Sequence, residues 1–177
     1  KFLCNKKIVM ITKFINKLKL YRKSYYLKTV LKTAASVKGT VKVNGPSYVN
    51  KNTILGANVH FNGLKIIGNG KVVIGDNFHS GQECTIISES HNFKGDKIPY
   101  DETFIRKEIF IQDNVWLGHG VLILPGVTIG EGAIIQAGAV VVNDVEVCGI
   151  AGGNPAKVFK FRDKDHYYQL KSEGKFH

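Results

Sequence analysis

The sequence has few cysteines, few prolines and no long hydrophobic segment, and each shortage argues against a class of protein. The three cysteines, Cys4, Cys84 and Cys148, are odd in number, far apart and without C-x-x-C spacing. This pattern argues against a disulfide framework and is typical of a reducing compartment. The alternative, a reactive thiol, finds no activating neighbour in the sequence.

Only four prolines accompany 19 glycines, a combination that regular tight corners explain better than low-complexity disorder. The longest uncharged run near the N-terminus, IVMIT, is far too short to span a bilayer. No small-residue cleavage site follows it cleanly, so we expect a cytoplasmic protein without a secretory signal. The length of 177 residues fits one domain with a modest appendage.

Negative charge is also scarce, since 14 acidic residues stand against 25 lysines and arginines and leave a net charge of +11. Such an excess attracts an anionic partner, such as nucleic acid, an acidic membrane face or a polyphosphate ligand. The lysines gather in residues 1–42 and 157–175, where a solvated basic face also explains them. Because no groove-reading motif or aromatic platform is present, we do not expect nucleic acid as the partner.

Residues 1–36 have the spacing of a helix. We expect a basic helical segment packed on the main domain; the alternative is a helix that lies on a membrane surface. The apolar residues that recur among the lysines at roughly helical intervals are Phe14, Ile15, Leu18, Leu20, Tyr21, Tyr25, Tyr26 and Leu27.

An aliphatic residue recurs every six positions through most of the remaining chain. The first series is Val43, Val49, Leu55, Phe61, Ile67 and Val73, and a slip of one position then gives Ile74, Ser80 and Ile86. The later series is Ile111, Leu117, Ile123, Ile129, Ile135, Val141 and Val147. A period of six fits neither an α-helical stripe nor simple strand alternation. It predicts a solenoid of short strands and tight corners in which each hexad buries one residue.

The segment IQDNVWLGHGVLILPGVTIGEGAIIQAGAVVVNDVEVCGIAGGNPAKVFKFR, residues 111–162, resembles the closing half of the hexapeptide-repeat acyltransferases. The likeness extends over residues 37–162 and is greatest to the galactoside and maltose O-acetyltransferases and their surface-polysaccharide relatives. It implies an all-β solenoid, a left-handed parallel β-helix with three hexads per coil, which works as a homotrimer. By that count Ile111, Ile129 and Val147 stack in coils about 4.8 Å apart.

Three parts are expected along the chain. Residues 1–36 form the basic N-terminal helical segment, residues 37–156 the β-helix acyltransferase domain, and residues 157–177 a basic C-terminal tail or helix. The six-residue series stops across residues 88–108, SESHNFKGDKIPYDETFIRKE, which predicts a protruding loop inserted into the β-helix.

His91 stands at the start of this loop, 17 residues after Ile74 of the hexad that begins IGDN. In the sugar O-acetyltransferases a catalytic histidine follows such a hexad at the same spacing, so the resemblance makes His91 the general base. A neutral imidazole accepts a proton near neutral pH, which is typically worth about 10²–10⁴-fold in rate. Glu89 would share a face with His91 in an extended segment and is a candidate to orient the imidazole; a solvated loop acid is the alternative.

The other five histidines carry weaker signals. His60, His166 and His177 are expected on the solvated surface, His79 faces outward in its hexad, and His119 can line a groove. A γ-class carbonic anhydrase would share the β-helix but would need three metal-binding histidines, two of them close in sequence. Because no H-x4-H spacing exists, we expect no metal site and no metal cofactor.

The resemblance also implies acetyl-CoA as co-substrate. It places Trp116, the only tryptophan, near the catalytic histidine of an adjacent subunit, with simple packing as the alternative. The other candidate CoA-binding residues are small residues beside the pantetheine arm, the AGGNPAK exit motif, and cations suited to phosphates. They are Gly118, His119, Gln136, Ala137, Gly138, Asn154, Pro155, Ala156, Lys157 and Arg162.

Together these features predict an acetyl-CoA-dependent O-acetyltransferase that acts on a sugar hydroxyl in bacterial surface polysaccharide synthesis. Its active sites would lie between the subunits of a homotrimer. The acceptor would be a sugar or a polysaccharide precursor, met through peripheral contact with the inner face of the membrane. The alternatives are an amino-sugar N-acetyltransferase, an enzyme like the serine O-acetyltransferases, and a non-catalytic β-helix scaffold.

Overall fold

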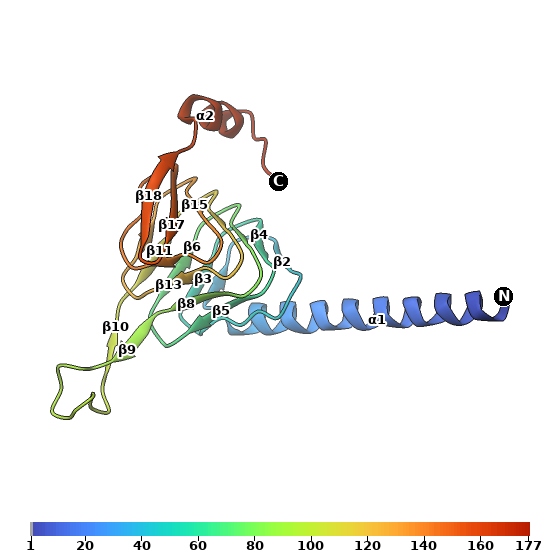
Figure 1. Cartoon of the computed structure of the whole chain (residues 1–177), viewed down its shortest axis with the longest axis horizontal. Coiled ribbons are helices and arrows are strands. Elements are labelled where there is room, and N and C mark those ends of the chain that lie inside the picture. The colour runs from blue at the N-terminus through green and yellow to red at the C-terminus, as the bar shows by residue number, and fades with distance from the viewer. Residues whose placement is uncertain (1) are drawn as a thin grey trace.

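A computed structural model describes the backbone of residues 2–177 and the side chains of residues 11–177. The chain forms a parallel β-solenoid with a helix at each end (Figure 1). Helix α1 (Phe2–Thr33) enters the solenoid, and helix α2 (Lys164–Ser172) follows its last strands. Cys84 and Cys148 are buried free thiols, whereas Cys4 lies outside the described side chains.

Three sheets form the faces of the solenoid, and the chain visits them in a fixed order. The first face contains β1 (Ser36–Val37), β3 (Thr53–Leu55), β6 (Val72–Ile74), β11 (Ile109–Ile111) and β14 (Thr128–Ile129). The second contains β2 (Val41–Val43), β4 (Val59–Phe61), β7 (His79–Ser80), β12 (Trp116–Leu117), β15 (Ile134–Ile135), β17 (Gly149–Gly153) and β18 (Ala156–Phe161). The third contains β5 (Leu64–Ile67), β8 (Cys84–Ile87), β13 (Leu122–Ile123) and β16 (Val140–Val141).

The core is a ladder of aliphatic side chains, as the period of six predicts. Ile111 pairs in register with Ile129, and Leu117 pairs with Ile135, with all four side chains buried. Each coil therefore stacks its apolar residues on those of its neighbour and excludes water from the axis of the solenoid.

Three ladder positions were predicted wrongly: Val73, which faces outward between the buried Val72 and Ile74, and the two described next. Ile67 is 51% exposed because the coil turns inward at Ile66, five residues after Phe61 instead of six. Val147 is 39% exposed, and Val145 bridges to Ile129 in its place. In both cases a corner differs by a residue or two from the regular hexad, which moves the following side chain out of the core.

The corner between the first and second faces carries a ladder of asparagines. Asn58, Asn77 and Asn114 have φ angles of 54°, 56° and 61°, in the left-handed region that asparagine tolerates better than most residues. The Asn58 side chain donates to Asn77 Oδ1 and that of Asn77 to Asn114 Oδ1, each at 2.9 Å. These bonds fix the stacking of three successive coils.

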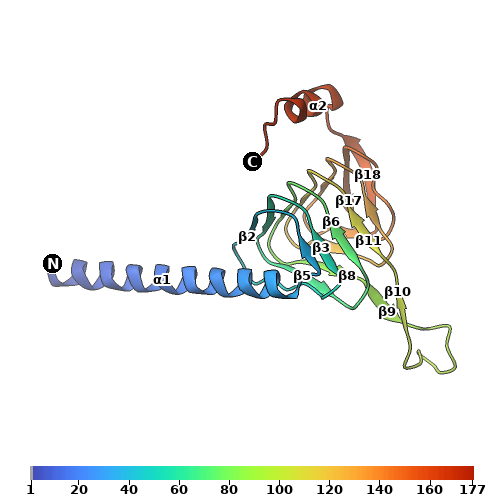
Figure 2. The same ribbon diagram turned by 180° about the vertical axis from the view of Figure 1, so that it is seen from behind.

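Residues 88–108 leave the coil between the third and first faces, as predicted. Strands β9 (Glu89–His91) and β10 (Phe104–Arg106) form an antiparallel hairpin that projects from the solenoid (Figures 1 and 2). At its tip the Asp101 carboxylate accepts hydrogen bonds from the Thr103 amide and hydroxyl. The protruding segment is therefore an ordered β-ribbon with a structured tip.

Helix α1 packs on the solenoid only through its last turns and otherwise projects away from it (Figure 1). Val30 is buried, and Tyr26 and Leu27 contact the core, whereas every side chain of residues 11–25 is exposed. The expected packing on the main domain thus holds for one end of the helix. Among the described residues, no helix has the length and apolarity needed to cross a membrane.

The expected C-terminal helix is present as α2, but residues 156–161 before it form β18, antiparallel to β17. Helix α2 then docks through Tyr167, whose hydroxyl donates to Glu131 Oε1 at 2.8 Å and accepts from Asn114 Nδ2 at 2.9 Å. Lys171 forms an ion pair with the same Glu131 oxygen at 2.5 Å. Beyond α2 the last residues return to the second face (Figure 2).

Candidate active site

His91 lies at the end of β9, in the last strand pair before the loop of the hairpin, with an exposed side chain. Its imidazole stacks on the Tyr100 ring, with centroids 3.9 Å apart and planes 14° from parallel. The Phe104 ring, directly opposite on β10, is 4.8 Å away. The two aromatic rings restrict the imidazole while its edge stays open to solvent, which suits a proton acceptor for an external substrate.

Glu89 lies on the same face of the ribbon but has other partners. Arg106 Nε donates to Glu89 Oε2 at 2.9 Å, and Asn69 Nδ2 lies 3.3 Å from Glu89 Oε1. The hydrogen bond from Arg106 holds the pKa of the Glu89 carboxyl below its ordinary value. In the described chain Glu89 thus joins the two hairpin strands to the preceding coil, and its contacts do not include His91.

Most candidate CoA-binding residues come together at one corner of the solenoid, between the second and third faces. We call this the donor corner and define it as residues 118–120, 136–138 and 152–155. Successive coils are joined there by hydrogen bonds from Gly118 N to Ile135 O and from Gly138 N to His119 O, at 2.7 and 2.8 Å. His119, Gln136, Ala137, Asn154 and Pro155 are exposed along this edge, and Ala156 and Lys157 follow at the start of β18.

Glycine is required at Gly118, because a Cβ there would lie 2.5 Å from the backbone nitrogen of Ala137. Gly138 has a φ of +71° and open space where a Cβ would be. The two glycines therefore leave backbone groups uncovered at this corner, which fits the close approach of a long thin ligand arm.

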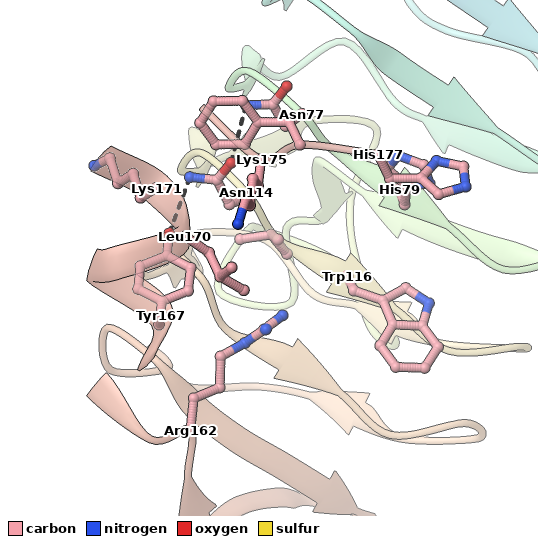
Figure 3. A pocket seen from close by; sticks show the side chains of 12 residues that line it. Asn77, His79, Asn114, Trp116, Arg162, Tyr167, Leu170, Lys171, Lys175 and His177 are labelled. Carbon is pink, nitrogen blue, oxygen red and sulfur yellow. Dashed lines mark hydrogen bonds between the residues drawn. The ribbon is translucent and has the colours of Figure 1, made fainter. Parts of the chain in front are cut away.

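Trp116 stands on the outer side of the second face, between His79 and Ile134 in the parallel register. Its side chain is 52% exposed and borders a cavity of about 330 Å³ beneath the C-terminal segment (Figure 3). Such a large apolar surface, left half open on a flat face, suits contact with a ligand or another chain.

Arg162 is engaged within the chain. Its Nε donates to the Gly132 carbonyl at 2.7 Å, and its guanidinium lies 5.5 Å from the centre of the Tyr167 ring. The structure thus uses Arg162 to hold α2, away from the donor corner, whereas Lys157 is exposed and pairs in register with Gly152.

A second cavity, of about 660 Å³, lies between α1 and the early coils. Its walls include Gln82 and Glu83, which precede His119 on the same edge; Gly120 N donates to Gln82 O at 2.8 Å. The donor corner therefore adjoins one wall of this cavity. Four cationic residues, Lys19, Arg22, Lys23 and Lys65, line it against the single acid Glu83.

Sequence reasoning missed two groups of residues. The cationic cavity depends on where α1 leaves the solenoid, which no local pattern indicates. His60, expected on the surface, is only 6% exposed, and His79 is covered in part by the C-terminal residues. Burial lowers the pKa of His60 below its ordinary value and that of His79 to about 4, so both rings are neutral at neutral pH. Counting in whole coils, about 18 residues, would have placed these two histidines side by side.

Several known proteins are similar to this chain in sequence or fold. The family described as bacterial transferase hexapeptide (six repeats) matches residues 108–143. A galactoside acetyltransferase in complex with coenzyme A is 30% identical, with a TM-score of 0.68 over 77% of this chain and 70% of that chain. A maltose O-acetyltransferase from Clostridium difficile 630 is 27% identical, with a TM-score of 0.61 over 74% of this chain and 70% of that chain.

An acetyltransferase from Vibrio cholerae O1 biovar eltor, complexed with acetyl coenzyme A, shares the fold. It is 23% identical, with a TM-score of 0.65 over 88% of each chain. No curated protein sequence matches significantly.

The solenoid and its matched repeats define a left-handed parallel β-helix of the hexapeptide class. The chain belongs to the hexapeptide-repeat acyltransferases. It is therefore an enzyme of acyl transfer, which confirms the expected fold and class.

Proposed function

We propose that this protein transfers the acetyl group of acetyl-CoA to a sugar hydroxyl, with His91 as general base. The observation that carries the proposal is the exposed imidazole of His91, in contact with Tyr100 and Phe104 at the loop end of the paired strands in the hairpin that projects from the described coils. Similarity to a galactoside acetyltransferase bound to coenzyme A and to a maltose O-acetyltransferase supports both the donor and the sugar acceptor.

The proposed reaction is a direct transfer. The neutral His91 imidazole accepts the proton of the acceptor hydroxyl while that oxygen attacks the thioester carbonyl. The tetrahedral intermediate collapses with cleavage of the carbon–sulfur bond, and the imidazolium returns its proton to the departing thiolate. The products are the acetylated sugar and CoA with a free thiol, so no covalent enzyme intermediate is needed.

Acetyl-CoA is proposed to lie along the donor corner. Its pantetheine arm would bind the backbone beside Gly118, His119 and Gly138, with Gln136 and Ala137 on the same edge. The nucleotide would lie near the turn at Asn154 and Pro155, followed by Ala156 and Lys157, where an exposed ammonium group suits its phosphates. Arg162 is a weaker candidate because it is already bound to Gly132.

The second cavity, lined by Lys19, Arg22, Lys23 and Lys65, is the proposed acceptor site. Clustered cations favour an acceptor that carries phosphate or carboxylate groups, such as a nucleotide-linked or lipid-linked sugar. This supports a role in bacterial surface polysaccharide synthesis in the cytoplasm. The exposed basic side chains of α1 suit peripheral contact with an anionic membrane face.

A homotrimer is proposed as the working form. His91 lies between the third and first faces, whereas the donor corner lies between the second and third. A flat solenoid face separates the two within one chain, so a complete site is best formed where two chains meet. The half-exposed Trp116 would then contribute to the pocket of its neighbour.

The test is thiol release from acetyl-CoA over a panel of neutral, acidic and amino sugars, comparing wild type with His91→Ala. Loss of a positioned base predicts a fall in kcat of about 10²–10⁴-fold. His166→Ala is the matched control, since His166 is an exposed histidine on α2, and it should retain full activity.

Full activity in His91→Ala would contradict the assigned base. Exclusive turnover of an amino sugar would replace O-acetylation with N-acetylation. Absence of turnover with every acceptor would favour a binding or scaffold role for this chain.

A further inference from the structure

Three histidines converge on the outer side of the second face, outside the candidate active site. His60 on β4 pairs in register with His79 on β7, and their ring centroids are 4.1 Å apart. His177 reaches them from the C-terminal segment, with its ring centroid 5.0 Å from that of His79. One ring nitrogen of each histidine lies within 4.8 Å of the others.

One of these nitrogens is buried without a partner. His79 Nε2 is the sole buried side-chain nitrogen or oxygen in the described chain that lacks a hydrogen bond. Buried polar atoms in folded proteins are paired in about 90% of cases or more, and an unpaired one commonly marks a missing water or ion. Because this nitrogen lies among other imidazoles, its position points to a group that accepts electron pairs from ring nitrogens, such as a metal ion.

His60 is held in the tautomer that a metal site needs. Asn58 Nδ2 donates to Asn77 Oδ1 and to the His177 carbonyl, which fixes the direction of the Asn58 amide. Asn58 Oδ1 therefore accepts from His60 Nε2 at 3.0 Å. An imidazole that donates through Nε2 keeps its lone pair on Nδ1, as in metal sites whose second ring nitrogen binds an oxygen acceptor.

The same asparagine positions the third histidine. The bond from Asn58 to the His177 carbonyl, 2.8 Å long, ties the last residue to the coil. Figure 3 shows His177 beside His79 at the edge of the smaller cavity, with Trp116 and Tyr167 on its other walls. The exposed His177 side chain has room to adjust, whereas the two coil histidines are held by the sheet.

We propose that His60, His79 and His177 form a tri-histidine site for a zinc ion, which fixes the C-terminal segment against the second face. Tetrahedral zinc holds its nitrogen ligands at about 2.0–2.1 Å, so the three nitrogens need only a small inward movement. A set of imidazoles without a carboxylate selects zinc and related transition metals over magnesium or calcium. Lys42 pairs with His60 in the sheet, and its positive charge repels a bound cation. Metal binding at this site therefore requires that the imidazoles add no positive charge of their own.

The proposed zinc is structural and lies apart from His91, so it goes beyond the acetyl transfer proposed above. It also differs from the expectation of no metal site. That expectation required two histidines close in sequence, whereas the solenoid brings His60 and His79 together across one coil.

The first test measures zinc affinity on untagged, chelator-stripped protein by competition with a chromophoric chelator. Wild type should bind one zinc ion per chain, and cobalt substitution should give the intense visible bands of a tetrahedral site. His177→Ala, which alters only an exposed side chain, should weaken binding by about 100-fold or more. His79→Gln should do the same, and His166→Ala is the control that should bind as wild type does.

The second test reads out the tether itself. Zinc should slow tryptic cleavage after Lys171 and Lys175 in wild type, followed by mass spectrometry, and should have no such effect in His177→Ala. Equal zinc affinity in wild type and His177→Ala would overturn the proposal. Cleavage of wild type at the same rate with and without zinc would overturn it as well.

Discussion

At the scale of single residues, the His91 side chain is exposed to solvent and is also restricted in its orientation. A histidine on a projecting ribbon would ordinarily sample several rotamers, and a base that moves loses the benefit of alignment. Stacking on Tyr100 at 3.9 Å and contact with Phe104 restrict the ring without covering it. The ribbon therefore presents a held imidazole to a substrate that approaches from outside the chain.

The ion pair between Glu89 and Arg106 gives a prediction about how this ribbon is positioned. Glu89→Gln and Arg106→Gln should each lower kcat by a similar, modest factor of about two to five, because each removes the same partly exposed pair. The double variant should lose no more than either single one. Steady-state kinetics with the preferred acceptor checks this.

Glu102→Gln, which breaks the exposed pair with Lys97 at the hairpin tip, is the control and should leave kcat unchanged. A much larger loss in Glu89→Gln than in Arg106→Gln, with a shifted pH profile, would instead show that Glu89 acts on His91 directly.

The interrupted repeat predicted that His91 lies on a protruding segment, and only the resemblance gave it a role, whereas the partners of Glu89 could not be predicted. Arg106 is 17 residues further along the chain, and only the hairpin register places it opposite Glu89. His60 was misplaced for a similar reason, because its burial comes from the distant residue His177 and not from its own hexad.

At the scale of elements, the period of six identified the strands well and the irregular corners poorly. A hexad count assumes that every corner uses the same number of residues. The corner at Gly68–Gly70 is longer, and Gly68 takes a φ of +92° there, so the ladder continues at Ile74 and Val73 faces outward. The resumed series from Ile111 was accurate until Val145 took the place of Val147.

Helix α2 depends on one buried hydroxyl, which gives a second prediction. Tyr167→Phe should destabilise the docked helix by about 1–3 kcal/mol, because it removes the bonds to Glu131 and Asn114 and leaves the Asn114 Nδ2 group without this acceptor. Hydrogen exchange of the α2 amides should become faster, while the coils keep their protection. Tyr168→Phe, a change in the neighbouring exposed tyrosine, should have no effect.

The docking of α2 on the solenoid should also depend on pH. Burial raises the pKa of the Glu131 carboxyl, but hydrogen bonds from Lys171 and Tyr167 outweigh it, and the net pKa lies below its ordinary value. Because the folded pKa is lowered, the stabilisation is present above the unfolded pKa of about 4.3 and is lost as the pH falls through the folded value. The fluorescence of Trp116, which borders the same cavity as Tyr167, should report undocking in acid. In Glu131→Gln this acid transition should be absent.

At the scale of the whole molecule, the proposed active-site residues lie where the six-residue repeat is interrupted by an inserted segment or where a corner exposes its backbone. A regular solenoid face presents the same shallow surface at every coil, so a pocket needs an added element. The hairpin carries the proposed base, α1 carries cations, and the glycines of the donor corner expose backbone groups. The sequence indicated the first and third of these, but the direction in which α1 projects depends on the contacts of its last turns, through Tyr26, Leu27 and Val30.

Because His91 and the donor corner are separate, mixing two variant chains can test whether one active site is built from two chains. His91→Ala removes the base but keeps the donor corner, whereas Ala137→Trp should block the exposed strip of that corner and keep the base. Each variant alone should be inactive. Trimers that contain both chains can be isolated through two different tags. In such a trimer each His91 position faces the donor corner of the next chain around the ring. One interface of the three then always pairs an intact base with an intact donor corner, so about one site in three should be active. Equal inactivity of mixed and pure assemblies, at the same solution mass and circular dichroism, would mean that each site is built within one chain. Recovery near one third would establish that a base from one chain serves acetyl-CoA held by the next.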